Sequence, residues 1–138
     1  MKKVTSLFLA LLFVCLAFTG CGKYVSSYSA VAFAHSNERD SAWMSFLSFN
    51  GSQVFKLKCE SDNEAAIQYS GKLESGSLTV YYDCGGEKKE LFSLHAGDDI
   101  QSAGGALPED TVYIIVETSE KCGNGSLSFE IVYTEKLQ

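Results

Sequence analysis

Proline, arginine and helical periodicity are scarce in this sequence. Among 138 residues there is one proline, Pro108, and one arginine, Arg39, and the net charge is -6. Binding to phosphates requires clustered positive charges, so we expect no nucleic-acid partner. After residue 41, no stretch of ten residues repeats its apolar positions with the period of a helix, which argues against a helical fold.

Motifs for known chemistry are also missing. The sequence has no G-x-S-x-G, no H-E-x-x-H and no C-x-x-C spacing. Acidic pairs such as Asp98-Asp99 lack the spacing of a calcium loop, and His35 and His95 stand outside any motif. We therefore expect no metal, no cofactor and no catalytic residues, with a small hydrolase as a third alternative.

The N-terminus has the pattern of a secretory signal. Lys2 and Lys3 precede an unbroken apolar run from Leu7 to Phe18, and small residues follow it. The run is well short of the roughly 20 residues that span a bilayer. An ordinary secretory signal cut near Gly20 is one interpretation.

The residues after the run favour a more specific interpretation. Phe18-Thr19-Gly20-Cys21 resembles the lipobox of bacterial lipoproteins. This resemblance implies that residues 1–20 are removed, that Cys21 is lipidated, and that the protein is held on the extracytoplasmic face of the cell membrane. Losing Lys2 and Lys3 changes the net charge from -6 to -8, so the membrane contact would come from the lipid and not from charge.

Alternating apolar residues beyond Trp43 predict an all-β domain. Short apolar runs recur about every ten residues and are separated by glycine or polar turns, which is typical of an antiparallel β-sandwich or jelly roll with seven or eight strands. Asn50-Gly51 predicts a hairpin. The expected strands are residues 43–49, 53–59, 66–73, 78–84, 89–94, 111–118 and 127–133. Leu57, Val80, Ile114 and Phe129 fall on core positions.

The remaining segments are expected to be irregular. Residues 21–41, rich in serine and alanine, are predicted to form a tether, with a possible short strand at residues 31–33. Residues 95–110 are predicted to form a long loop. The expected division is therefore a signal peptide at 1–20, a lipidated tether at 21–41 and a β-sandwich domain at 42–138.

Glycine and apolar spacing gives a second resemblance. The segments 73–80, 85–86 and 125–131 make residues 43–133 similar to small β-sandwich domains of Gram-positive lipoproteins and to bacterial pre-peptidase C-terminal domains. Such a resemblance implies a fold and no chemistry.

Three cysteines remain after Cys21. If every expected strand reverses at its turn, Cys59, Cys84 and Cys122 lie at one end of the sandwich. Cys84 and Cys122 stand in glycine-rich turns that could adopt disulfide geometry, whereas Cys59 is on a core position. We therefore predict a Cys84–Cys122 bridge, with three reduced thiols as the alternative.

The expected function is binding. The main hypothesis is a non-catalytic, membrane-anchored lipoprotein that serves as a binding or adaptor module for a protein or glycan partner. The alternative is a carbohydrate-binding module at the cell surface, because Tyr81, Tyr113 and Trp43 could form an exposed aromatic strip that stacks on sugars. The two hypotheses differ in where those rings lie.

Overall fold

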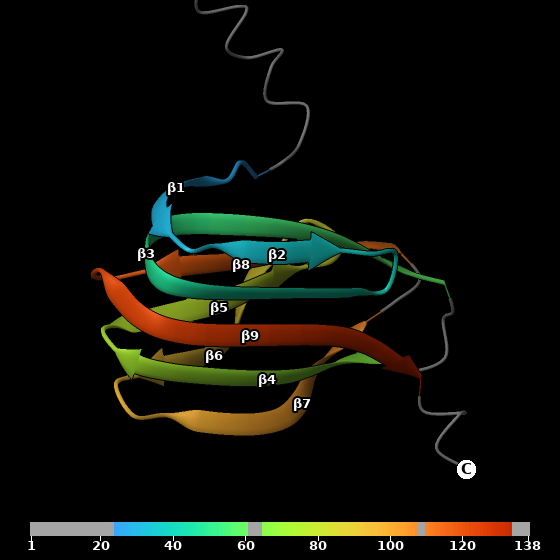
Figure 1. The fold of residues 1–138 in the computed structure, drawn as a ribbon. Helices are drawn as coiled ribbons and strands as arrows, with labels where there is room; N and C mark the ends of the chain where they lie inside the picture. The colour runs from blue at the N-terminus through green and yellow to red at the C-terminus, as the bar shows by residue number, and fades with distance from the viewer. Residues whose placement is uncertain (1–23, 61–64, 108–109, 134–138) are drawn as a thin grey trace, which may run out of the picture.

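The fold is an all-β, antiparallel sandwich, as the alternation predicted (Figure 1). The computed structural model describes residues 24–60, 65–107 and 110–133. Within these ranges the strands are β1 (Ser27–Val31), β2 (Ala34–Asn37), β3 (Ser41–Cys59), β4 (Ala65–Ser75), β5 (Ser77–Asp83), β6 (Lys88–His95), β7 (Asp99–Leu107), β8 (Asp110–Thr118) and β9 (Cys122–Tyr133). A search of these residues for an apolar helix with the length of a membrane span found none.

Strand β3 belongs to both layers of the sandwich because it bends at its centre. Its first arm, residues 41–49, pairs with β9, and its second arm, residues 52–59, pairs with β8. At the bend Gly51 has a φ of +134°, and a Cβ there would lie 2.3 Å from the carbonyl oxygen of Ser27. The predicted hairpin at Asn50-Gly51 is therefore wrong: the chain does turn there, but its two arms pair with different strands.

Strand β2 lies between the two arms of β3 and explains why they do not pair (Figure 1). Its residues 34–37 pair with residues 42–45 of the first arm. The Asn37 side chain then reaches the second arm, where its Nδ2 donates to the Lys56 carbonyl and its Oδ1 accepts from the Lys56 amide, both at 2.9 Å. One asparagine side chain thus replaces a rung of strand pairing and nearly closes the sheet.

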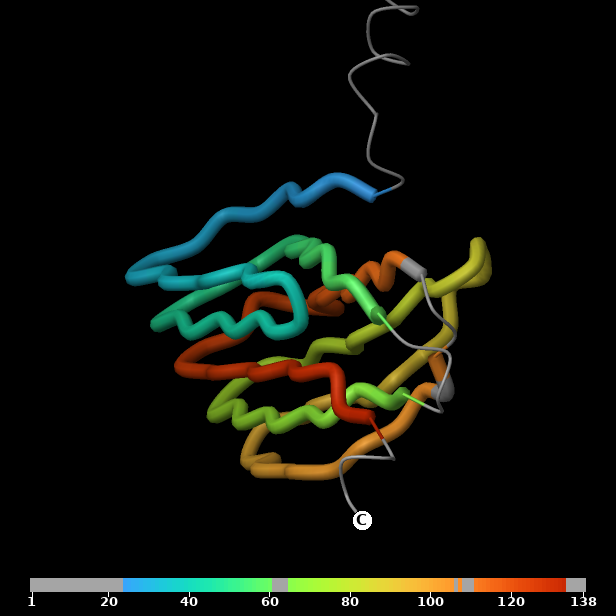
Figure 2. Tube along the Cα trace, turned by 90° about the vertical axis from the view of Figure 1, so that its right-hand side faces the viewer, coloured from blue at the N-terminus to red at the C-terminus, as the bar shows by residue number. Residues whose placement is uncertain are grey.

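Apart from β1 and β2, which both pair with β3, the hydrogen-bonded order of the strands is β6-β5-β8-β3-β9-β4-β7. The first layer contains the first arm of β3 with β9, β4 and β7. The second layer contains the second arm of β3 with β8, β5 and β6. Figure 2, turned by 90°, shows β9 and β4 on one side and the β5–β6 turn on the other.

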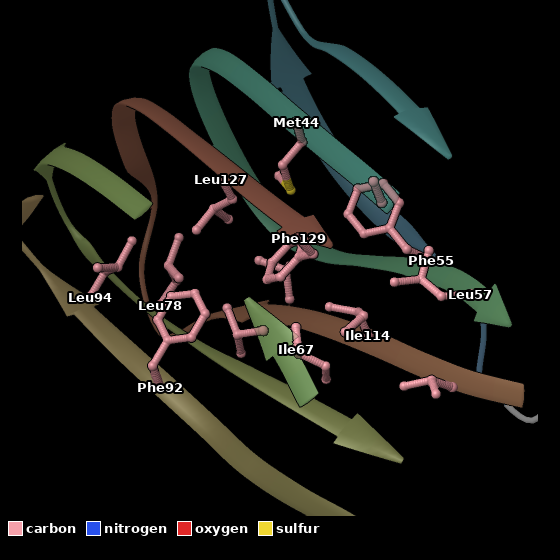
Figure 3. Packing of buried hydrophobic residues seen from close by; sticks show 14 of the residues in the cluster. Met44, Phe55, Leu57, Ile67, Leu78, Phe92, Leu94, Ile114, Leu127 and Phe129 are labelled. Atoms are coloured by element: carbon pink, nitrogen blue, oxygen red, sulfur yellow. The ribbon is translucent and has the colours of Figure 1, made fainter. Parts of the chain in front are cut away.

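Aromatic and aliphatic side chains from both layers fill the space between them (Figure 3). Phe129 of β9 lies 6.1 Å, ring centre to ring centre, from both Phe55 and Phe92 of the opposite layer. Tyr69 stacks on Phe92 at 4.3 Å, which joins β4 to β6. All four predicted core residues are buried, confirming the alternation that selected them: they are Leu57, Val80, Ile114 and Phe129.

Two segments predicted to be irregular are strands. Residues 24–41 contain β1 and β2, which pair with β3, so this segment belongs to the folded domain, and the predicted boundary at residue 42 is too late. The predicted loop at 95–110 contains β7, an edge strand paired with β4. The first segment contains large side chains such as Tyr28 and Phe33, which pack on Phe49, but they follow no clear alternation. Strand β7 has few large apolar side chains and is held mainly by backbone pairing with β4, which leaves little trace in a hydrophobic pattern.

The extra strand β7 overturns the predicted disulfide. Because β7 adds one more reversal, β8 runs antiparallel to β5, and the turn that carries Cys122 lies at the opposite end from Cys84. The Cys122 thiol donates to the carbonyl of Ser77, at the start of β5, across 3.3 Å. Cys84 follows Asp83, which ends that strand. At about 3.4 Å per residue, the six residue steps from Ser77 to Asp83 span roughly 20 Å, so Cys84 lies at least that far from the Cys122 end. A disulfide needs Cα atoms within about 7 Å, so the Cys84–Cys122 bridge is wrong.

Candidate functional site

The outer surface of the first layer is the candidate site. We call it the β9 face and define it by the outward side chains of residues 41–47 on β3, 124–130 on β9, 66–74 on β4 and 99–103 on β7. Strand pairing sets these side chains in three rows across the four strands. The rows are Ser41, Glu130, Gln68 and Ala103; then Trp43, Ser128, Ser70 and Gln101; then Ser45, Ser126, Lys72 and Asp99.

Two adjoining hollows lie on the β9 face. The larger has a volume of about 620 Å³ and includes Ser45, Ser126 and Lys72 in its lining. The smaller, of about 210 Å³, includes Ser70 and Ser128. In the middle row the two central positions are Ser128 and Ser70, between the longer Trp43 and Gln101, so the face is lowest there. We call the two hollows and the surface between them the trough. From residue 124 to residue 130 of β9 the trough runs roughly 20 Å at about 3.4 Å per residue.

Trp43, the single tryptophan, stands at the β3 flank of this trough and is 45 % exposed. Its neighbours Ala42 and Met44 point into the core, so the pleat of β3 directs the indole outward. Leu47, on the same arm, is also exposed and lines the larger hollow. An exposed indole beside a row of hydroxyls and amides offers an apolar ring surface next to hydrogen-bonding groups.

The charges on the β9 face are mostly negative. Four carboxylates and one ammonium group line the two hollows: Glu74, Asp98, Asp99, Glu130 and Lys72. Asp98 accepts a 2.7 Å hydrogen bond from the His95 amide. Of the ion pairs found between described residues, none includes Lys72 or any of the other three carboxylates. Lys72 is opposite Asp99 in the third row, so the two linings together carry one positive and four negative charges.

The aromatic strip expected from the sequence is divided between the two layers. Tyr113 is on β8 of the second layer, where its ring meets Tyr24 edge-on at 5.7 Å. Tyr81, on β5, lies beneath the Lys88 ammonium, which is 4.3 Å from its ring centre. Of the three proposed rings only Trp43 is on the β9 face. The polar residues beside it were missed, although serines repeat at alternate positions in β9.

The second layer holds the start of the described chain. The Tyr24 hydroxyl donates a 2.5 Å hydrogen bond to Oδ2 of Asp83, a buried carboxylate whose Oδ1 accepts from the Gly86 amide at 2.8 Å. The Asp83 hydrogen bond, followed by desolvation and by the negative charges of Asp83 and Glu117, raises the pKa of Tyr24 to about 12. Tyr24 therefore fastens the N-terminal segment to β5 and β8, on the layer opposite the β9 face.

Neither histidine forms part of a recognisable catalytic or metal centre. His95 is exposed beside Asp98, with 3.7 Å between Nδ1 and Oδ2, and His35 packs its ring against Phe33 and Phe55. In the part of the chain that the structure describes, no group of three His, Cys, Asp or Glu is arranged to hold a metal ion. Cys21, the predicted lipidation residue, lies outside the described residues.

Comparison with solved structures shows the fold. The structure is similar to that of TmCBM61 in complex with β-1,4-galactotriose, with a TM-score of 0.52 and 11 % identity over 78 % of this chain and 88 % of that one. A family 29 carbohydrate-binding module gives a TM-score of 0.42 at 12 % identity, covering 79 % of this chain and 81 % of the other. PliG of Aeromonas hydrophila, a periplasmic lysozyme inhibitor, gives 0.43 at 17 % identity, covering 68 % and 88 %. No family model and no curated protein matches the sequence.

Proposed function

We propose that this protein is a non-catalytic carbohydrate-binding module and that the β9 face is its glycan site. The observation that carries the proposal is the exposed Trp43 at the flank of a serine-lined trough. The similarity to TmCBM61, which was solved with a galactotriose, supports a glycan as the ligand for a sandwich of this shape. The adaptor function expected first from the sequence is the second candidate.

The chemistry of the trough suits a sugar chain. A pyranose ring has an apolar C–H face that can stack on the large apolar face of an indole. Its hydroxyl groups both donate and accept, so they match the serine hydroxyls and the Gln68 and Gln101 amides. A trough roughly 20 Å long would hold several sugar units.

The proposal includes display outside the membrane. Lipidation of Cys21 would place the attachment point three residues before Tyr24, which is fastened to the second layer by Asp83. The β9 face belongs to the other layer and would therefore be turned away from the attachment point. Anchoring and glycan capture would then use opposite sides of one domain.

Affinity electrophoresis tests the glycan site. The purified full-length protein, kept in detergent, is run through native gels that contain soluble polysaccharides, and retardation measures affinity. We expect Trp43→Ala to weaken binding about tenfold, the equivalent of about 1.4 kcal/mol. Tyr81→Ala removes an aromatic residue from the other layer and should bind as the parent does. If the parent binds no glycan, or if Trp43→Ala binds equally well, the proposal is wrong.

Metabolic labelling with a fatty acid tests the anchor separately. The parent should incorporate label and fractionate with membranes, whereas Cys21→Ala should carry no label and either be released or remain uncut. Unchanged labelling and fractionation of Cys21→Ala would refute the lipid anchor but leave the glycan site standing.

A further inference from the structure

We infer that the β9 face selects glycans with free, positively charged amino groups, such as polymers of de-N-acetylated amino sugars, over anionic polysaccharides. This inference rests on the proposed glycan site and deepens it. Its basis is the exposed indole of Trp43 beside a trough whose lining carries more carboxylates than cations.

The excess charge lies on three of the four strands. Glu130 on β9 lines the smaller hollow, and Glu74 on β4 and Asp99 on β7 line the larger. Lys72 is the single cation in either lining, and it forms no ion pair with a described carboxylate. A sugar chain bound in the trough would therefore lie beside carboxylates along most of its length.

Some carboxylates outside the trough have a cation beside them. Glu60 pairs with Arg39, and Glu117 pairs with Lys88 at 2.7 Å. Glu74, Asp99 and Glu130 form no ion pair with a described residue, so they are available to accept hydrogen bonds from a ligand ammonium. A polymer of uronic acids or a phosphate-bearing polymer would place like charges against them, and like-charge contacts are unfavourable.

Trp43 adds to the preference for a cation. An ammonium group near an indole face is attracted by the negative face of the ring, an interaction that is strongest with tryptophan. The same indole can stack on the C–H face of a neighbouring sugar. An amino sugar polymer offers both groups in every unit, whereas a neutral glycan offers only the second.

Three hexasaccharides of matched length provide the test: a glucosamine oligomer, its N-acetylated form and a galacturonate oligomer. Affinity for the full-length protein in detergent is measured by calorimetry at low salt, at a pH where the amines are protonated. We expect the glucosamine oligomer to bind most tightly, the N-acetylated oligomer several-fold more weakly and the galacturonate oligomer not measurably. Because exposed charges are screened, the preference should shrink at about 0.5 M salt, where the Debye length is below roughly 5 Å.

Charge-neutralising variants locate the effect. Each exposed charge pair changes affinity by up to about fivefold, so Glu74→Gln/Asp99→Asn should bring glucosamine and N-acetylglucosamine oligomers close to equal affinity. Glu90→Gln, on β6 of the other layer, removes one carboxylate charge away from the trough and retains an acceptor for the Ser93 hydroxyl, so it serves as the control. Binding of both oligomers should be unchanged in Glu90→Gln.

The outcomes separate this inference from the proposed function. If the galacturonate or the N-acetylated oligomer binds as tightly as the glucosamine oligomer, the charge preference is refuted and the glycan site stands. If the preference survives in Glu74→Gln/Asp99→Asn, the trough carboxylates are not its source and the inference fails. If no oligomer binds, the glycan site itself is refuted.

Discussion

Substitution of Tyr24 by phenylalanine tests how firmly the N-terminal segment is held to the second layer. The change removes one hydroxyl and keeps the ring that packs against Tyr113. What is lost is the 2.5 Å hydrogen bond to the carboxylate of Asp83, which is buried. Hydrogen bonds to charged groups contribute about 1.5–3 kcal/mol, and Tyr24 is partly exposed, so we expect a loss near the lower end of that range.

The pKa of Tyr24 gives a second measure of the same bond. In the folded protein this pKa is raised to about 12, against about 10 for a free tyrosine. Because the folded value is the higher one, the stabilisation is complete below pH 10 and is lost as the pH rises through 12. Two pKa units correspond to at most about 2.7 kcal/mol, and solvent screening at a partly exposed site reduces this to about 1–2 kcal/mol.

Urea denaturation at several pH values between 7 and 12 measures the effect. The free energy of unfolding of Tyr24→Phe should be about 1–2 kcal/mol below that of the parent from pH 7 to pH 10, and the two should converge toward pH 12. Tyr81→Phe removes a hydroxyl from the same layer for which the structure shows no hydrogen bond, so its difference from the parent should stay near zero. A gap that is constant to pH 12, or absent at pH 7, would refute the reasoning.

Three further predictions concern the fold. Gly51→Ala should destabilise the protein by about 1–3 kcal/mol more than Gly85→Ala, since both residues have positive φ but only a Cβ at 51 meets the β1 backbone; urea denaturation of both variants decides. Phe129→Ala should lower the free energy of unfolding by about 3–5 kcal/mol in the same assay, because its ring is 1 % exposed and contacts both layers. Peptide mapping under non-reducing conditions should yield no Cys84–Cys122 peptide, and recovery of one would contradict the direction of β8.

The sequence was a reliable guide wherever one side of a strand is buried. Alternating side chains in β5 and β9 mark their buried faces directly, and the core residues chosen from them are buried. The same logic could not find β7, where Ile100 is the one large apolar side chain before Leu107. An edge strand of this kind is held by its pairing with β4, and backbone pairing is not encoded in side-chain hydrophobicity.

The missed strand shows how a local omission becomes a global error. Strand directions in an antiparallel fold are counted by reversals, so leaving out β7 reversed the expected direction of β8. The reversed direction of β8 placed Cys122 at the wrong end of the molecule and led to the prediction of a disulfide that the structure does not allow. The apolar pattern of β8 was recognised correctly, but its direction depended on a segment that had no such pattern.

The candidate site was only partly predictable for a related reason. Trp43 could be named because a lone tryptophan in an alternating strand has a definite parity. Its neighbours across the sheet are Ser128 and, one strand further, Ser70, which lie 85 and 27 positions away in the sequence. Serines are unremarkable as single residues, and they become a trough only when β9 and β4 are placed side by side beside β3.

The N-terminal strands connect the proposed anchor to the proposed site. Strand β2 pairs with the arm of β3 that carries Trp43, with Ser36 opposite the indole position. Strand β1 crosses the bend at Gly51, where Tyr28 stacks on Phe49 at 5.2 Å. The segment expected to be a flexible tether is thus held to the second layer at Tyr24 and supports the first arm of β3 through β2. A flexible tether would let the glycan site take any orientation, whereas paired strands keep Trp43 in a fixed position relative to the point where the chain leaves the domain.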